Sequence, residues 1–388
     1  MQPNQNEKHN ENHNENHNEN NKQITFAIIG AGSGGRSFAV YLSNCGYKVN
    51  LVYRSKKNIT RIRKHKIIDS QGEIPGEFKI NMVTTSYRRA LKGAQAILYV
   101  VPASVQSSIT KQIAPFLEDG QIIVLNPGRT WGAIETYNLL SKYCPDLEIY
   151  VGETQTLLFT CRKQEDYGVN ILRIKESIDC CFYPENQNLI VGSFITRIFP
   201  QFNMVNDIRI TSLNNMGAII HPAVTLLNAG SILRNEEFFF YQEGISPEIT
   251  RLIEKIDSER CHIIEALGLE PITFKEWAQT CYKCRSESYY QIFLEIKSYQ
   301  SIRAPQSLDV RYITEDIPTG LVPLSSLGRY LNISTPTINA LIILANTLMK
   351  KNFWKIGRTI ENIKLPFNYR RSQNFQYMTM DRPKILFE

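Results

Sequence analysis

The chain has 388 residues, of which 43% are hydrophobic and 21% charged, a composition typical of globular proteins with two or three domains. Its formal net charge of +7 is a mild excess without a long basic block, so we expect no nucleic-acid partner. No apolar run approaches the roughly 18 residues that span a bilayer, and the cysteines lack the spacing of a disulfide framework. We therefore expect a cytoplasmic protein that does not enter a membrane.

The segment 1–22 consists almost entirely of Asn, Glu, His and Gln. It has too few apolar side chains to offset the entropy lost on ordering, so we predict a disordered low-complexity tail. Histidines recur in it every four residues, but no fold holds them together, and we predict no metal site. Residues 371–388 are assigned to a C-terminal extension outside the domains.

From Ile24 the pattern changes to that of an α/β domain. A short apolar run is followed by a glycine-rich turn, an amphipathic segment over 36–44 and a second apolar run over 48–53. Similar strand-like runs at 96–101 and 121–125 indicate a Rossmann-type, doubly wound parallel sheet. Residues 149–198 are rich in β-branched and aromatic side chains, and we predict further strands there that complete a domain spanning 24–203.

The second half of the chain has helical periodicity. Ser246-Pro247 is a helix-start signal, followed by apolar residues on one face and by Gly268 as a stop signal. Another helix is predicted from Thr335-Pro336. We therefore expect an all-α domain over 204–370, with the active site between the two domains.

The glycine-rich turn matches the dinucleotide fingerprint G-x-G-x-x-G, because Gly30, Gly32 and Gly35 lie directly between a predicted strand and a predicted helix. The first glycine permits the tight turn, the second leaves room for a pyrophosphate, and the third lets helix and strand pack closely. Ser33 lies in the same turn, where the free amides of the helix favour a phosphate. We predict cofactor binding at Gly30, Gly32, Ser33 and Gly35.

The residues after the second predicted strand favour NADP. An NAD enzyme usually has Asp or Glu there to bind the adenosine ribose. This chain has Arg54 and Ser55 instead, with no acidic residue between Gly30 and Asp69. A 2′-phosphate would therefore meet Arg54 and Ser55 without a repelling carboxylate, and NAD is the less favoured cofactor.

Two polar motifs in the helical half are candidates for chemistry. Pro222 disfavours helical geometry at His221, so we expect a helix to break or kink there and to present the imidazole to a cleft. Further on, Arg311, Glu315 and Asp316 precede an apolar segment. Taken alone, the first motif is also compatible with a buried structural histidine and the second with an ion pair in a surface loop.

Several motifs in the same order resemble the octopine/nopaline (opine) dehydrogenases over residues 24–365. They are the nucleotide turn, Val101-Pro102-Ala103, Glu153-Thr154 with Cys161-Arg162, His221-Pro222, residues 256–260, residues 266–268, Arg311-Tyr312 with Glu315-Asp316, and residues 357–359. The resemblance implies a catalytic dyad of His221 and Asp316, with Arg311 holding a substrate carboxylate. It also implies an NADPH-dependent condensation of an amino acid, or another amine, with a 2-oxo acid such as pyruvate through reduction of an imine.

Two alternatives remain open at this point. A 2-hydroxy-acid or ketopantoate-type reductase has the same architecture, but such enzymes usually rely on a lysine near the domain junction, and residues 211–230 contain none. A non-catalytic NADPH-binding sensor would not need His221, Asp316 and Arg311 together. The sequence identifies neither the amine nor the 2-oxo acid, and it leaves the oligomeric state open, with a homodimer as one candidate assembly.

Overall fold

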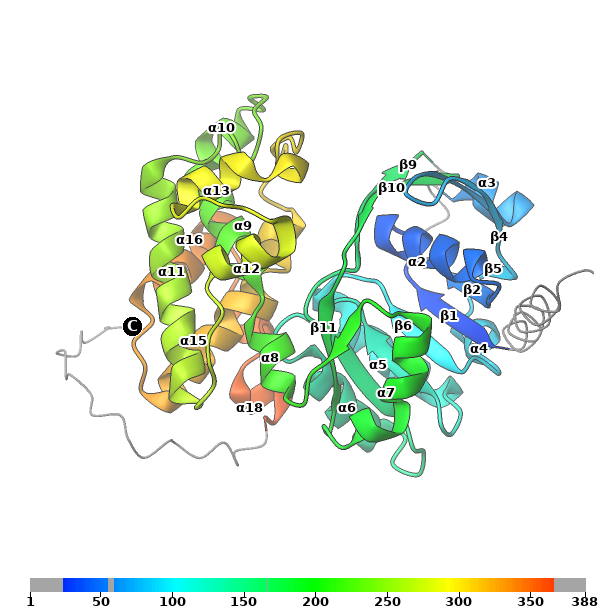
Figure 1. The fold of residues 1–388 in the computed structure, drawn as a ribbon. Helices are drawn as coiled ribbons and strands as arrows, with labels where there is room; N and C mark the ends of the chain where they lie inside the picture. The colour runs from blue at the N-terminus through cyan, green and yellow to red at the C-terminus, as the bar shows by residue number, and fades with distance from the viewer. Residues whose placement is uncertain (1–23, 55–58, 166, 366–388) are drawn as a thin grey trace, which may run out of the picture.

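The computed structural model describes residues 24–54, 59–165 and 167–365. An α/β domain and a helical domain lie side by side (Figure 1). The predicted tail over 1–22, the extension over 371–388 and Ser55 lie outside the described residues. No helix within the described part of the chain is long and apolar enough to cross a membrane.

The first domain is built on a sheet with the strand order β12-β11-β8-β7-β6-β1-β2-β5. Neighbouring strands are parallel, except that β11 runs antiparallel to β8. The order reverses between β1 and β6, which is where a doubly wound sheet opens a crevice for a ligand. The predicted Rossmann-type fold is therefore confirmed. The strands of this sheet are β1 (Thr25–Ile29), β2 (Lys48–Val52), β5 (Met82–Thr84), β6 (Ala96–Tyr99), β7 (Ile122–Leu125), β8 (Tyr150–Thr154), β11 (Ile178–Tyr183) and β12 (Phe202–Met204).

The helices of the first domain flank this sheet. They are α2 (Ser33–Asn44), α3 (Thr60–His65), α4 (Tyr87–Leu91), α5 (Ala103–Ile113), α6 (Gly132–Tyr143) and α7 (Gln187–Ile198). The α2 helix starts three residues earlier than the amphipathic pattern indicates, because the helix already includes Ser33 of the glycine-rich turn. This places the first amides of α2 at the carboxyl end of β1.

The prediction for residues 149–198 is wrong in part. Two of the strands there, β9 (Phe159–Gln164) and β10 (Gly168–Ile174), lie outside the main sheet. They form a second sheet with β3 (Ile67–Gly72) and β4 (Gly76–Lys79). The last part of the segment forms the helix α7 where a strand was predicted.

The physical reason lies in α2, which is buried without interruption from Gly35 to Leu42. One sheet covers only one side of such a helix, and the second sheet covers the other. The Phe38 ring packs edge-on against Phe159 at 4.8 Å, and the buried Arg36 guanidinium donates to the carbonyls of Gln164 and Gly168 at 3.3 and 2.8 Å.

The glycine-rich turn requires its first and last glycines for different steric reasons. Gly30 has a φ of +116°, and a Cβ atom there would lie 2.3 Å from the Val100 carbonyl oxygen. A Cβ atom on Gly35 would lie 1.7 Å from the carbonyl oxygen of Gly30. At Gly32 a Cβ atom would meet nothing within 4 Å. The fold itself thus needs Gly30 and Gly35, whereas Gly32 leaves open space at the start of α2.

The second domain is helical, as the sequence predicts. Ser246 caps α11 by accepting from the Ile249 amide, and Gly268 follows its end with a φ of +74°. The helices are α8 (Ile208–Leu213), α9 (Met216–Leu227), α10 (Ala229–Leu233), α11 (Pro247–Ala266), α12 (Phe274–Tyr282), α13 (Tyr289–Glu295), α14 (Arg311–Thr314), α15 (Val322–Leu331), α16 (Pro336–Met349), α17 (Phe353–Ile356) and α18 (Ile360–Ile363).

Of the break or kink predicted at His221, the break is wrong, because α9 continues through Pro222. Proline lacks the amide that would donate to the carbonyl four residues earlier, so one helical hydrogen bond is lost. The residues around it, from Ala218 to Leu226, are nearly all buried in the domain core, and this packing stabilises the helix despite the loss.

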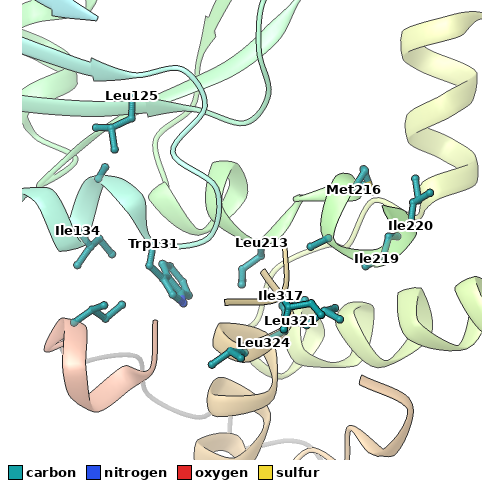
Figure 2. Close-up of a cluster of buried hydrophobic side chains, with 14 of the residues drawn as sticks. Leu125, Trp131, Ile134, Leu213, Met216, Ile219, Ile220, Ile317, Leu321 and Leu324 are labelled. Carbon is teal, nitrogen blue, oxygen red and sulfur yellow. The ribbon is translucent and has the colours of Figure 1, made fainter. Parts of the chain in front are cut away.

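Apolar and polar contacts join the two domains. In Figure 2 the indole of Trp131 lies between Leu125 and Ile134 of the first domain and Leu213 and Leu324 of the second. The Arg358 side chain, which is only 4% exposed, donates from the helical domain to the carbonyls of Gly128 and Thr130, each at 2.9 Å. The loop that follows β7 is therefore held from both sides.

We expect Gly35→Ala to lower the free energy of unfolding by about 3 kcal/mol, the upper end for an overpacked site, because its methyl group would collide with the Gly30 carbonyl. Gly32→Ala is the matched control and should change it by less than about 0.5 kcal/mol. Urea unfolding of both variants measures the difference. Equal stability of the two variants would contradict this account of the turn.

Candidate active site

His221 and Asp316 form a direct pair in the helical domain. The Nδ1 atom of His221, on α9, lies 2.7 Å from Oδ2 of Asp316, which directly precedes a π-helical turn over Ile317–Leu321. The imidazole also stacks on the Tyr312 ring with 4.4 Å between ring centres. With Nδ1 donating to the carboxylate, Nε2 is the ring nitrogen left to accept or donate a proton in the adjoining space.

Two adjacent carboxylates, Glu315 and Asp316, are buried at this point, each about 1% exposed. The guanidinium of Arg129, in the loop after β7, lies 3.4 Å from Glu315 Oε1 and 3.5 Å from Asp316 Oδ1. The backbone amide of Ala103 donates to Glu315 Oε1 at 3.1 Å. Groups from the first domain therefore stabilise two negative charges that belong to the second.

Neighbouring charged groups, with Arg129 the largest contributor, determine the protonation state of both carboxyls. Burial alone would raise the pKa of Glu315 and of Asp316, since it disfavours the charged form. The positive charges of Arg129 and Arg311, together with the hydrogen bonds from Arg311 to Glu315 and from His221 to Asp316, outweigh this effect. The pKa of each carboxyl therefore lies below its usual value. Asp316 is thus a carboxylate at neutral pH, able to orient the imidazole and to stabilise its protonated form.

Arg311 lies on the outer side of this cluster. Its Nε atom donates to Glu315 Oε2 one helical turn away, while 60% of its side chain is exposed. It is absent from the described residues that line the neighbouring cavity. The binding of a substrate carboxylate by Arg311 stays a prediction, and the structure places a different arginine, Arg129, at the cavity.

A cavity of about 190 Å³ adjoins the pair. Residues of both domains line it, which fits the expected location between the domains. They are Arg129, Gln155, Thr156 and Lys175 from the first domain and Asn214, Asn215, Met216, Gly217, Ile220, His221, Tyr241, Trp277, Tyr282 and Tyr299 from the second.

The start of α9 fits Arg129 closely. Asn215 directly precedes the helix, and its Oδ1 atom accepts from Arg129 Nη1 at 3.0 Å. Its Nδ2 atom is buried with no hydrogen-bond partner in the described part of the chain. A Cβ atom on Gly217 would lie 2.8 Å from Arg129 Nη1 and 3.1 Å from His221 Cε1, so a larger residue would displace the guanidinium from its present position.

The predicted cofactor residues lie at the carboxyl ends of β1 and β2. Gly32 precedes α2 without a side-chain cap, and the first turn of α2, which begins at Ser33, holds no acidic residue. The amides of this turn and the space above Gly32 therefore suit a pyrophosphate. Arg54 is exposed just after β2, and Ser55 lies outside the described residues.

Sequence reasoning missed the two cavity residues with cationic side chains, Arg129 and Lys175. A signal for Arg129 existed, since it follows a predicted strand at the edge where parallel sheets bind ligands. Lys175 follows β10, whose departure from the main sheet the strand-like pattern does not reveal. No sequence signal indicated it.

Comparison with known proteins places this site in a family. The helical domain of the NAD/NADP octopine/nopaline dehydrogenases matches residues 204–349, and the N-terminal part of NAD-dependent glycerol-3-phosphate dehydrogenase matches residues 25–130. An opine dehydrogenase from Arthrobacter sp. (strain 1C) is 36% identical over 342 residues, which cover 88% of this chain and 95% of that protein. The chain belongs to the opine dehydrogenase family.

Solved structures of opine dehydrogenases have the same fold. Octopine dehydrogenase in complex with NADH and agmatine aligns with a TM-score of 0.72 at 17% identity, over 88% of this chain and 95% of that one. Yersinopine dehydrogenase with bound NADP⁺ gives a TM-score of 0.67 at 15% identity, over 89% and 94%. The expected class, a nicotinamide-dependent oxidoreductase of the opine dehydrogenase type that acts on CH–NH bonds, is confirmed.

We expect Arg129→Met to lower the free energy of unfolding by about 3 kcal/mol at pH 7, because it leaves two buried carboxylates without their main counter-charge. The matched control Arg311→Met removes a largely exposed guanidinium and should cost no more than about 1 kcal/mol. Urea unfolding of the three proteins provides the comparison.

The difference in unfolding free energy between wild type and Arg129→Met should also depend on pH. The lowered carboxyl pKa values of Glu315 and Asp316 mean that their ion pairs stabilise the wild type at neutral pH, and this contribution is lost as the pH falls below about 4. The stability gap between wild type and Arg129→Met should therefore narrow toward pH 3. A gap that does not change with pH would argue against the ion-pair account.

Proposed function

We propose that this opine dehydrogenase homologue catalyses the NADPH-dependent reductive condensation of an amino acid, or a related amine, with a 2-oxo acid such as pyruvate. The observation that carries the proposal is the 2.7 Å contact between His221 and Asp316 at the wall of a cavity between the nucleotide-binding and helical domains. The named ligands of structural relatives, NADH with agmatine and NADP⁺, fit a reaction between an amine and a nicotinamide cofactor.

The chemistry needs a group that moves protons near neutral pH. The amine attacks the ketone carbon, water leaves, and the resulting imine becomes a secondary amine when its carbon gains a hydride. His221 is suited to give a proton to the departing water and to the nitrogen, since its imidazole lines the cavity. Asp316 holds the other ring nitrogen, which fixes the tautomer and stabilises the imidazolium.

The cofactor would be held by the glycine-rich turn at the start of α2, where Ser33 and the open space at Gly32 suit a pyrophosphate. When bound it would supply the hydride. Arg54, exposed at the end of β2, suits a 2′-phosphate, and this supports NADPH over NADH. Arg311 is proposed to hold a substrate carboxylate by exchanging part of its contact with Glu315, since most of its side chain is exposed.

The reaction is tested by following NADPH oxidation with pyruvate and a panel of amines, each omitted in turn. We expect oxidation only when the 2-oxo acid and an amine are both present, because the hydride acceptor is the imine, and we expect NADPH to give a higher kcat/KM than NADH. Full-rate oxidation with pyruvate alone would identify a 2-hydroxy-acid reductase instead. A preference for NADH would refute only the proposed cofactor.

We expect His221→Ala to reduce kcat by about 10² to 10⁴, the usual cost of removing a general acid/base, without a large change in NADPH affinity. Asp316→Asn should give a smaller loss with an altered pH profile, because the amide keeps the shape but does not stabilise the imidazolium. Steady-state kinetics and NADPH titration of both variants are the measurements. Wild-type turnover by folded His221→Ala protein would exclude the mechanism.

A further inference from the structure

The charges around the cavity do not balance. The two guanidinium groups of Arg129 and Arg311 offset the two carboxylates, Glu315 and Asp316. Among the described residues that line the cavity, the other Lys or Arg side chain besides Arg129 is Lys175, which directly follows β10. Lys175 has no carboxylate ion-pair partner among the residues that the structure describes, and no Asp or Glu lines the cavity.

The Lys175 ammonium is fixed in place by neutral acceptors. Its Nζ atom donates to Thr156 Oγ1 at 3.0 Å and to the Leu157 carbonyl at 2.8 Å, while its own backbone amide donates to the Leu158 carbonyl. An ammonium group has three donors, so one remains for another acceptor. The Lys175 charge is half-buried and contacts protein dipoles but no carboxylate. Such a charge favours the binding of an anion.

The groups that face Lys175 leave its positive charge unopposed. Arg129, from the loop after β7, repels it, and the nearby thiols are Cys161 of β9 and Cys281 of α12. Burial raises the pKa of both thiols, so they stay neutral near pH 7. Burial, with Arg129 adding to it, lowers the pKa of Lys175 to about 8. The ammonium form therefore predominates at neutral pH and is lost above pH 8.

We infer that Lys175 is a specificity residue of this cavity, which binds a carboxylate of the reacting pair and disfavours amines with a positively charged side chain. This assignment rests on the proposed function for the identity of the reactants. The cationic wall and the aromatic side chains Tyr241, Trp277, Tyr282 and Tyr299 suit an amino acid with a neutral side chain. Within the cavity lining that the structure describes, no carboxylate is present to pair with a guanidinium.

A cofactor phosphate is the other anion with the same chemistry. Leu157, whose carbonyl accepts from Lys175, lies close to Gly34 of the nucleotide turn, since a Cβ atom there would be 3.1 Å from its methyl carbons. Binding measurements separate the two sources. Isothermal titration calorimetry first measures NADPH binding and then measures pyruvate binding to the NADPH-bound protein. The proteins compared are wild type, Lys175→Met, Lys175→Arg and the control Lys163→Met, whose lysine is exposed on β9.

We expect Lys175→Met to weaken pyruvate binding, or to raise KM for pyruvate or the amino acid, by about 10- to 100-fold, the usual range for a lost charged hydrogen bond. Lys175→Arg should restore most of this loss, and Lys163→Met should behave as wild type. If Lys175→Met weakens only NADPH binding, the anion is a cofactor phosphate and the inference fails. Equal affinities for pyruvate and equal KM values in wild type and Lys175→Met would also overturn it.

Charge selectivity provides a second readout. L-Arginine and L-citrulline have nearly the same shape, but only arginine carries a side-chain charge. The wild type should have a higher kcat/KM with citrulline than with arginine. The ratio of kcat/KM for arginine to kcat/KM for citrulline should rise by at least about tenfold in Lys175→Glu, which corresponds to about one charge-pair interaction. An unchanged ratio in Lys175→Glu would refute the selectivity.

The pH profile tests the titration of the same group. Since the ammonium is lost above pH 8, the wild-type Kd for pyruvate should rise between pH 7 and pH 9, whereas it should stay nearly flat for Lys175→Arg. Parallel profiles would contradict a role for the Lys175 charge. Absence of NADPH oxidation with every substrate pair would refute the proposed function, whereas titrations of the NADPH-bound protein with pyruvate and with amino acids would still decide the role of Lys175.

Discussion

The contact of Arg129 with two buried carboxylates is the constraint on which the site depends. Glu315 and Asp316 belong to the helical domain, and Arg129 belongs to the loop after β7 in the nucleotide-binding domain. Neither carboxylate is stable in a buried position without a counter-charge. Docking of the two domains therefore brings the largest single counter-charge to Asp316, in addition to His221 and Arg311 of its own domain, and so stabilises the carboxylate that orients His221.

The fold keeps that loop in place from several directions. The Thr130 amide donates to the Thr319 carbonyl at 3.1 Å, the Trp131 amide donates to Ser212 Oγ at 3.2 Å, and Arg358 donates to two carbonyls of the same loop. The cluster around the Trp131 indole adds apolar burial to these contacts (Figure 2). Precise placement of a charged group by rigid packing is what a proton-transfer site requires, since small displacements weaken hydrogen bonds to the reacting atoms.

The same packing explains why α9 tolerates Pro222. The proline removes one helical hydrogen bond, yet the helix must pass Arg129 closely, and Gly217 provides the room for this approach. His221 lies one turn after Gly217, so both residues face the cavity. The imidazole is then fixed by Asp316 on one side and by the Tyr312 ring on the other.

Local sequence patterns predicted the fold class and the nucleotide turn, and the resemblance to the opine dehydrogenases implied the pairing of His221 with Asp316. Each depends on a local pattern: glycines between a strand and a helix, apolar residues at helical spacing, and motifs in a family's order. The tertiary structure decided what depends on partners distant in the chain. The strands β9 and β10 lie in a second sheet because α2 is buried on both sides. The helix α9 continues through Pro222 because packing in the surrounding core stabilises it by more than one lost hydrogen bond costs. Arg129 lines the cavity, whereas most of the Arg311 side chain is exposed. The position of a charged side chain in a folded protein depends on long-range packing and on its ion-pair partners. Neither can be seen in the residues that adjoin it in the sequence.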